Sequence, residues 1–165
     1  MKRIILIVII LLACGISQAS VSPEILSATK YASKRTGIPE WLILSIAHVE
    51  SGFNPYAVNV AGKSYQPKTK EEAYAIIRNA ASAGKSFDVG VMQVNSFWFK
   101  KFNIPYHYGL DLQNSFVMGA EILREEILRN GNNWLSVGYY HSKNVNLAVK
   151  YFQKIKYQSE NYNLR

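Results

Sequence analysis

The sequence predicts a single, mainly helical domain with at most a small β element. Three observations lead to this fold class. The 165 residues suit one compact domain. Apolar residues recur with helical spacing in most segments, and residues typical of helix ends bound these segments. No repeats, low-complexity tracts or linkers interrupt the chain, so we expect one domain over residues 20–165 behind a short N-terminal segment.

The N-terminal segment, residues 1–19, has the pattern of a signal peptide. Two basic residues precede an apolar run, Ile4 to Ala13, which is too short to span a bilayer as a helix. Small residues follow up to Ala19, and we expect cleavage after that residue. The chain is therefore expected to leave the cytoplasm for the periplasm.

Cys14 allows a second interpretation of the same segment. Leu11-Leu12-Ala13-Cys14 is similar to a lipobox, in which the cysteine is acylated and becomes the first residue of a membrane-anchored lipoprotein. An uncleaved N-terminal anchor is a third possibility. With cleavage after Ala19 the mature chain contains no cysteine, which suits an oxidising compartment.

The first half of the chain predicts three helices. Ser22-Pro23-Glu24 is a typical helix start, and that helix is expected to end near Arg35, before Gly37. A second helix from about Pro39 is apolar on almost every face, which is typical of a buried central helix, and ends at Glu50-Ser51-Gly52. The polar stretch that follows is expected to be irregular up to Lys70. Thr69 and Glu72 form a capping box for a third helix, which extends to about Ser82.

The second half is also mainly helical. We expect a loop or short strand at 87–95 and helices at 96–102, 111–129, 134–141 and 145–157, followed by a frayed polar tail from Gln158. Five large aromatic residues in these and the earlier helices are expected to fill the core: Trp41, Phe97, Trp98, Phe99 and Trp134.

Composition and charge exclude several classes of function. Hydrophobic residues make up 48% and charged residues 18%, which excludes a disordered chain. A single cysteine and three scattered histidines make a metal site improbable, and the motifs of nucleotide-binding loops and zinc peptidases are absent, so we expect neither metal nor cofactor. The net charge of +8 favours anionic partners such as nucleic acids, lipid head groups or wall polymers. The export signal argues against nucleic acid.

Glu50 is the candidate catalytic residue on physical grounds. It lies at the C-terminal end of an apolar helix, where the helix dipole disfavours a carboxylate. Burial beside Ile46, Val49 and Phe53 disfavours the charged form further, and both effects raise a carboxyl pKa. A glutamic acid that remains protonated near neutral pH can act as a general acid, although a surface carboxylate that merely ends the helix has the same sequence pattern.

Four motifs, in order along the chain, carry a resemblance to a known family. They are ESGFNPYAVN at 50–59, GVMQVN at 90–95, a helical motif with Asn114, Gly119 and Leu123, and Tyr139-Tyr140-His141. Together they cover roughly residues 22–155 and resemble the lytic transglycosylases with an SLT domain. The resemblance implies a lysozyme-like α+β fold with a catalytic cleft.

The resemblance also implies roles for individual residues. Glu50 would be the catalytic acid and base, and Tyr140 would orient Glu50 or the sugar. Gln93 and Asn95 would hydrogen-bond the sugar, and Asn59 would lie near its acetamido group. The neighbouring motif residues Ser51 and Met92 are assigned to substrate binding as well.

The family acts on the glycan strands of peptidoglycan. The sequence shows no clear second carboxylate for Glu50; Asp88 is the nearest candidate, and a structural role is the alternative for it. One acid suffices if the acetamido group of N-acetylmuramic acid attacks its own anomeric carbon and the 6-hydroxyl then closes a 1,6-anhydro ring. The rival interpretations are a goose-type lysozyme or related muramidase that uses water, and a glycan-binding assembly protein without activity.

Two departures from the family pattern stand out. His141 replaces the usual asparagine of the fourth motif, and residues 62–86 lengthen the stretch between the first two motifs. The long stretch resembles the specialised members that open the wall for conjugation, pilus and secretion systems. We expect it at the rim of the cleft, as one end of the glycan groove or as a docking surface for an apparatus. The enzyme itself is expected to be a monomer.

Overall fold

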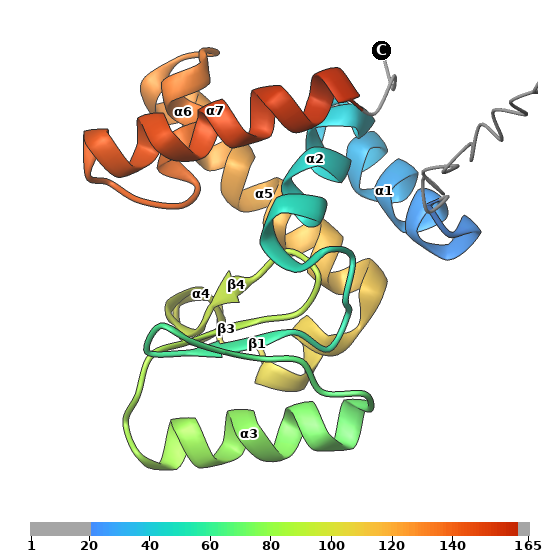
Figure 1. Cartoon of the computed structure of the whole chain (residues 1–165), viewed down its shortest axis with the longest axis vertical. Helices are drawn as coiled ribbons and strands as arrows, with labels where there is room; N and C mark the ends of the chain where they lie inside the picture. Colours follow the sequence, from blue (N-terminus) through green and yellow to red (C-terminus); the bar gives the residue numbers. More distant parts are fainter. Residues whose placement is uncertain (1–20, 162–165) are drawn as a thin grey trace, which may run out of the picture.

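The computed structural model describes residues 21–161. The predicted signal peptide, Cys14 and the last four residues lie outside this part of the chain. Two regions face each other in Figure 1: a group of helices above, and a small sheet with one helix below it. The helices are α1 (Pro23–Thr36), α2 (Glu40–Ser51), α3 (Lys70–Ser82), α4 (Ser96–Lys101), α5 (Leu112–Asn130), α6 (Trp134–Tyr139) and α7 (Val145–Asn161).

The expected helices are all present, with small differences at their ends. The hydroxyl of Ser22 accepts a hydrogen bond from a backbone N–H of α1, and Gly37 closes that helix at φ 75°. The side chain of Asp111 caps α5 in the same way. Helix α6 stops at Tyr139, two residues before the expected end, and α7 continues to Asn161, past the expected frayed tail. A short 3-10 helix at Tyr106–Leu110 was not predicted.

The sheet corrects the expectation of an irregular stretch before Lys70. Strands β1 (Val58–Val60), β2 (Lys63–Tyr65), β3 (Phe87–Val89) and β4 (Val94–Asn95) pair antiparallel in the order β2-β1-β3-β4. Ala61 and Gly62 join the first two strands at φ 50° and 87°, the backbone of a tight hairpin turn. Strands of two or three residues are too short for an alternating pattern to be read from sequence.

Helix α3 shows what the lengthened stretch 62–86 does. Its apolar face buries Ala73, Ile77 and Ala80, and the helix contacts β1, β3 and the 3-10 helix. The β1–β2 turn reaches the cleft described below, whereas α3 covers the lower part of the sheet (Figure 1). The hairpin of this stretch therefore reaches the cleft, and the inner face of α3 packs on the hydrophobic core.

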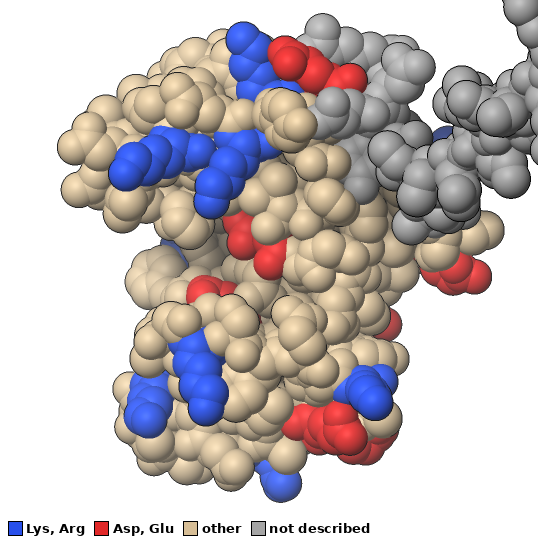
Figure 2. Space-filling model, viewed as in Figure 1, with Lys and Arg blue, Asp and Glu red and all other residues tan. Residues whose placement is uncertain are grey.

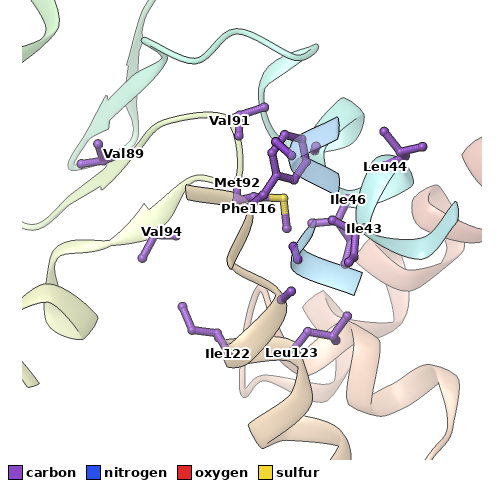
Figure 3. Packing of buried hydrophobic residues seen from close by; sticks show 14 of the residues in the cluster. Ile43, Leu44, Ile46, Val89, Val91, Met92, Val94, Phe116, Ile122 and Leu123 are labelled. Carbon is purple, nitrogen blue, oxygen red and sulfur yellow. The ribbon is translucent and has the colours of Figure 1, made fainter. Parts of the chain in front are cut away.

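The core joins the two regions around α2 and α5. Ile43 and Ile46 of α2, Phe116 and Leu123 of α5 and the buried Met92 form one cluster (Figure 3). Helix α2 is the buried central helix that its sequence predicts. No helix of residues 21–161 is long and apolar enough to cross a membrane.

The aromatic residues expected in the core divide into three groups. Phe99 is fully buried. Trp41, Trp98 and Trp134 are partly buried, and Trp41 packs against Trp134 with ring centroids 6.2 Å apart. Phe97 is 60% exposed, so the expectation was wrong for this residue. It lies at the start of α4 and lines the cleft described below.

Candidate active site

A cleft of about 730 Å³ lies between the helical region and the sheet. Figure 2 shows the hollow, with acidic side chains inside it and basic side chains on both lips. Six of the eight predicted site residues line this cleft: Glu50, Asn59, Gln93, Asn95, Tyr140 and, as the second-carboxylate candidate, Asp88. The cleft therefore gathers residues from the first, second and fourth motifs.

Ser51 and Met92 lie outside the cleft lining. The Ser51 hydroxyl donates to the backbone oxygens of Val91 at 2.8 Å and Ala47 at 3.1 Å, which ties the end of α2 to the second motif. Met92 is fully buried, and its backbone oxygen accepts a hydrogen bond from the Tyr140 hydroxyl at 2.7 Å. Both residues hold the second motif in place in this structure.

Glu50 sits in the last turn of α2 and faces the cleft. Burial raises the pKa of its carboxyl from the ordinary 4.5 to about 7, and the negative charge of Asp88 acts in the same direction. A hydrogen bond from Tyr151 and the positive charge of Lys154 oppose the rise. The raised pKa expected from the sequence is confirmed, with burial as its main cause.

Tyr151 is the site residue that sequence reasoning missed. Its hydroxyl donates to Oε1 of Glu50 at 2.6 Å, from the middle of α7. Burial raises the pKa of Tyr151 well above its usual range, so the phenol remains a donor. The orienting contact that the resemblance assigned to Tyr140 is thus made by Tyr151. The two rings stack with centroids 6.4 Å apart.

The ring of His141 stacks on the ring of Tyr151. Its ring is parallel to that of Tyr151, with centroids 4.8 Å apart and an interplanar angle of 3°. Burial and the nearby Lys154 lower its pKa, and Asp88 opposes that change. A flat ring at this position can stack on Tyr151, which the asparagine usual in the fourth motif cannot do.

A row of polar side chains crosses the sheet and forms the floor of the cleft. The register pairs Ser64 with Asn59, Asn59 with Asp88, and Asp88 with Asn95. Residues paired across strands project from the same face, so all four side chains line the cleft. Asn95 donates to Oδ1 of Asp88 at 2.7 Å, and Asn59 donates to Ser64 at 3.2 Å. The row depends on strand register, which is why Ser64 was not predicted.

An ion pair between a buried acid and an exposed lysine lines the cleft. Glu126 of α5 is 1% exposed, yet its carboxylate pairs with Lys143 and accepts a hydrogen bond from Asn130. Lys143 follows the fourth motif, so this pair attaches that loop to α5. At one end of the cleft Phe97 and Trp98 form an aromatic wall with ring centroids 5.4 Å apart.

No group of three or more His, Cys, Asp or Glu residues within 21–161 could hold a metal ion. The arrangement is one of acid–base chemistry on a polar, elongated ligand. The Glu50 carboxyl, with its raised pKa, shares one cleft with a row of amide and carboxylate groups and with two aromatic rings.

Comparison with protein families gives this arrangement its context. The family model described as "Transglycosylase SLT domain" matches residues 27–164. The chain belongs to this family. The match includes the whole cleft of the SLT domain, from Glu50 to Tyr151.

Two groups of relatives are similar to this SLT domain. The type IV secretion system protein virB1 of Brucella abortus is 35% identical over 83 residues, which are 49% of this chain and 35% of virB1. Protein IpgF of Shigella sonnei is 28% identical over 135 residues, or 79% of this chain and 74% of IpgF. The similarity to virB1 thus spans about a third of that protein's length. No solved structure matches the chain.

Gln93 has a structural role in addition to the sugar binding that was predicted for it. It adopts φ 45°, and its amide nitrogen donates to the backbone oxygens of Ala57 at 3.0 Å and Gly90 at 2.9 Å. The side-chain amide therefore holds the second motif of the SLT domain to β1. The side-chain oxygen of Gln93 takes no part in these two hydrogen bonds.

Gln93→Ala is expected to lower stability as well as activity. The change removes both side-chain hydrogen bonds, although each oxygen keeps a backbone donor, the N–H of residue 90 or of residue 93. The two lost hydrogen bonds together cost about 1–3 kcal/mol. Thermal unfolding followed by circular dichroism measures the loss. Asn132→Ala, at an exposed position remote from the cleft, is the control and should unfold close to the wild-type temperature. An unchanged melting temperature for Gln93→Ala would show that the two hydrogen bonds contribute nothing.

The pKa of Glu50 makes the stability of the SLT domain depend on pH. The carboxyl ionises near 4.5 when unfolded and near 7 when folded, so the unfolded state loses its proton first as pH rises. Its contribution to folding is complete below pH 4.5 and is lost between pH 4.5 and 7. Glutamine does not titrate. In denaturant unfolding, the free energy of unfolding of Glu50→Gln should therefore rise relative to that of the wild type, by up to about 3 kcal/mol between pH 4.5 and 7. A difference between the two proteins that does not change with pH would contradict the raised pKa.

Proposed function

We propose that the chain is a peptidoglycan lytic transglycosylase that cleaves the β-1,4 bond between N-acetylmuramic acid and N-acetylglucosamine. The observation that carries this proposal is Glu50, an acid with a pKa of about 7 facing a polar cleft. Membership of the SLT family and the similarity to a secretion system protein support it. Neither cofactor nor metal enters the proposed reaction.

The proposed reaction uses Glu50 twice. Protonated Glu50 gives its proton to the glycosidic oxygen as the bond to C1 of the muramic acid breaks. The acetamido oxygen of the same sugar bonds to C1, which balances the developing positive charge. Glu50, now a carboxylate, takes the proton of the 6-hydroxyl; that oxygen attacks C1 and the acetamido group is released. The product is a 1,6-anhydro ring, and no water is consumed.

The other cleft residues bind and orient the glycan in this proposal. Tyr151 keeps the Glu50 carboxyl in one orientation through its 2.6 Å hydrogen bond. Asn59, Asn95 and Gln93 line the cleft and would present polar groups to the sugar. Ser51 and Met92 support the second motif, so their effect on substrate would be indirect, whereas Tyr140 both donates to Met92 and lines the cleft.

Mass analysis of the products tests the reaction. The mature domain is incubated with purified sacculi, and the released muropeptides are measured. We expect 1,6-anhydro ends, which are lighter by one water molecule than the reducing ends of a hydrolysis. Release of reducing ends alone would establish a muramidase instead.

The muramidase is the second candidate because of Asp88. This carboxylate lines the cleft with Glu50, and its charge is strong enough to raise the Glu50 pKa. Burial raises the pKa of Asp88 itself, while its hydrogen bond with Asn95 opposes that change. A second carboxylate could activate water or stabilise the cation, as in glycosidases that use two acids.

Asp88→Asn separates these mechanisms. If the acetamido group supplies the nucleophile, we expect activity to fall less than about tenfold, because only the electrostatic effect on Glu50 and one hydrogen bond change. The anhydro product should persist. A loss of a hundredfold or more, with folding intact, would make Asp88 a catalytic partner. Initial rates on sacculi and product masses measure both quantities.

We also propose that the chain acts in the periplasm, where it opens the wall locally for an envelope-spanning apparatus. The signal-like pattern of residues 1–19 and the similarity to virB1 support this location and role. N-terminal analysis of the protein from cells distinguishes cleavage after Ala19 from acylation at Cys14. A chain that begins at Met1 would contradict both forms of processing.

A further inference from the structure

A second, smaller pocket of about 230 Å³ opens beside the catalytic acid. It lies between α2 and α7, whereas the main cleft lies between the helices and the sheet. Glu50 and His141 line both spaces, so the pocket and the cleft adjoin at these two residues. A ligand bound in the cleft at Glu50 therefore lies next to this pocket.

One face of α7 builds most of this side pocket. Leu147 is three or four residues before Lys150 and Tyr151, and these are four or three residues before Lys154, the spacing that aligns side chains along a helix. Val49 of α2 lies opposite. The pocket thus combines two aliphatic side chains with two ammonium groups, next to a half-buried acid.

The two lysines form no ion pair with an acid of residues 21–161, although the charge of Lys154 acts on Glu50. Both Lys150 and Lys154 are exposed. Like charges four residues apart on a helix repel each other. Lys143, by contrast, is paired with Glu126. Figure 2 shows basic side chains over α7 on the lip above the acidic side chains of the hollow.

We propose that the side pocket binds the peptide branch of the peptidoglycan strand through its carboxylates. This inference rests on the proposed substrate. The muramic acid whose anomeric carbon lies beside Glu50 carries a peptide on its lactyl group, and that peptide begins with alanine followed by an acidic residue. The alanine fits the aliphatic surface of Val49 and Leu147, and the acidic residue fits Lys150 and Lys154. The lysines would then distinguish peptide-bearing from bare strands.

A binding experiment tests this inference without any turnover. The probes are N-acetylmuramoyl-alanyl-glutamic acid and the same compound with both carboxylates converted to amides. The mature domain is titrated with each by calorimetry or NMR at low salt. We expect the acid to bind about 5- to 10-fold more tightly, since two exposed charge pairs contribute modestly. The preference should decrease as salt screens the charges.

The matched variants are Lys150→Met with Lys154→Met, and Lys156→Met as the control. Lys156 is exposed on α7 but does not line the side pocket. The double variant should bind the two probes equally, and the control should keep the preference. Equal affinity in the wild type, or a preference that survives in the double variant, would overturn the inference. A preference without anhydro products from sacculi would support the pocket and contradict the proposed reaction.

Discussion

Glu50→Gln is expected to lower the rate of sacculus cleavage at least about a hundredfold, which is the lower range for loss of a general acid. The amide has nearly the shape of the carboxyl, and its oxygen can still accept the hydrogen bond from Tyr151. It can neither give a proton to the glycosidic oxygen nor take one from the 6-hydroxyl. Release of soluble muropeptides over time measures the rate.

Glu40→Gln is the matched control for this experiment. Glu40 lies in the first turn of the same helix and is exposed, far from the cleft. The Glu40→Gln variant should cleave sacculi at the wild-type rate. Near-normal cleavage by a correctly folded Glu50→Gln would refute the assignment of Glu50. A wild-type chain that binds strands but never cleaves them would favour the glycan-binding assembly protein.

Gly138→Ala should cause the largest loss of stability among single changes considered for this chain. A Cβ at position 138 would lie 2.8 Å from the backbone carbonyl carbon of Ala148 and 2.9 Å from its Cβ. Backbone atoms of α7 cannot move aside as a flexible side chain can. We expect a loss of about 3 kcal/mol, at the upper end for overpacking, as α6 and α7 separate.

The same change should lower activity through the position of Tyr151. Helix α7 carries Tyr151 to Glu50, and a displaced helix would lengthen their 2.6 Å hydrogen bond. Thermal unfolding and sacculus cleavage measure the two effects. Gln153→Ala, at an exposed position of α7, is the control and should stay within about 0.5 kcal/mol of wild type. An unchanged melting temperature for Gly138→Ala would contradict the close helix contact.

Local sequence patterns were sufficient to predict the helices and the raised pKa of Glu50. Ser22 and Asp111 cap their helices with their own side chains, and Gly37 ends α1 in a left-handed conformation. These contacts join residues within one turn, so sequence spacing reveals them. The raised pKa of Glu50 followed from its place at the end of an apolar helix. Burial of that helix was itself readable from the sequence.

The sheet and the aromatic wall of the cleft could not be predicted from local sequence patterns. Strands such as Val94–Asn95 contain too few residues to show alternation, and their pairing depends on segments far apart in the chain. Phe97 and Phe99 have equally apolar side chains. Only the orientation of α4 decides that Phe99 is buried and Phe97 lines the cleft.

The sequence by itself determined the family and the helices, and it singled out Glu50 and five further residues of the cleft, because motifs and caps are short-range patterns. The tertiary structure decided which groups meet that acid. Tyr151 donates to Glu50 across 101 positions of sequence, and strand register aligns Ser64 with Asn59, Asp88 and Asn95. Lys150 and Lys154 become a side pocket only when α7 packs against α2. Such contacts depend on how elements pack, and no local pattern encodes that packing.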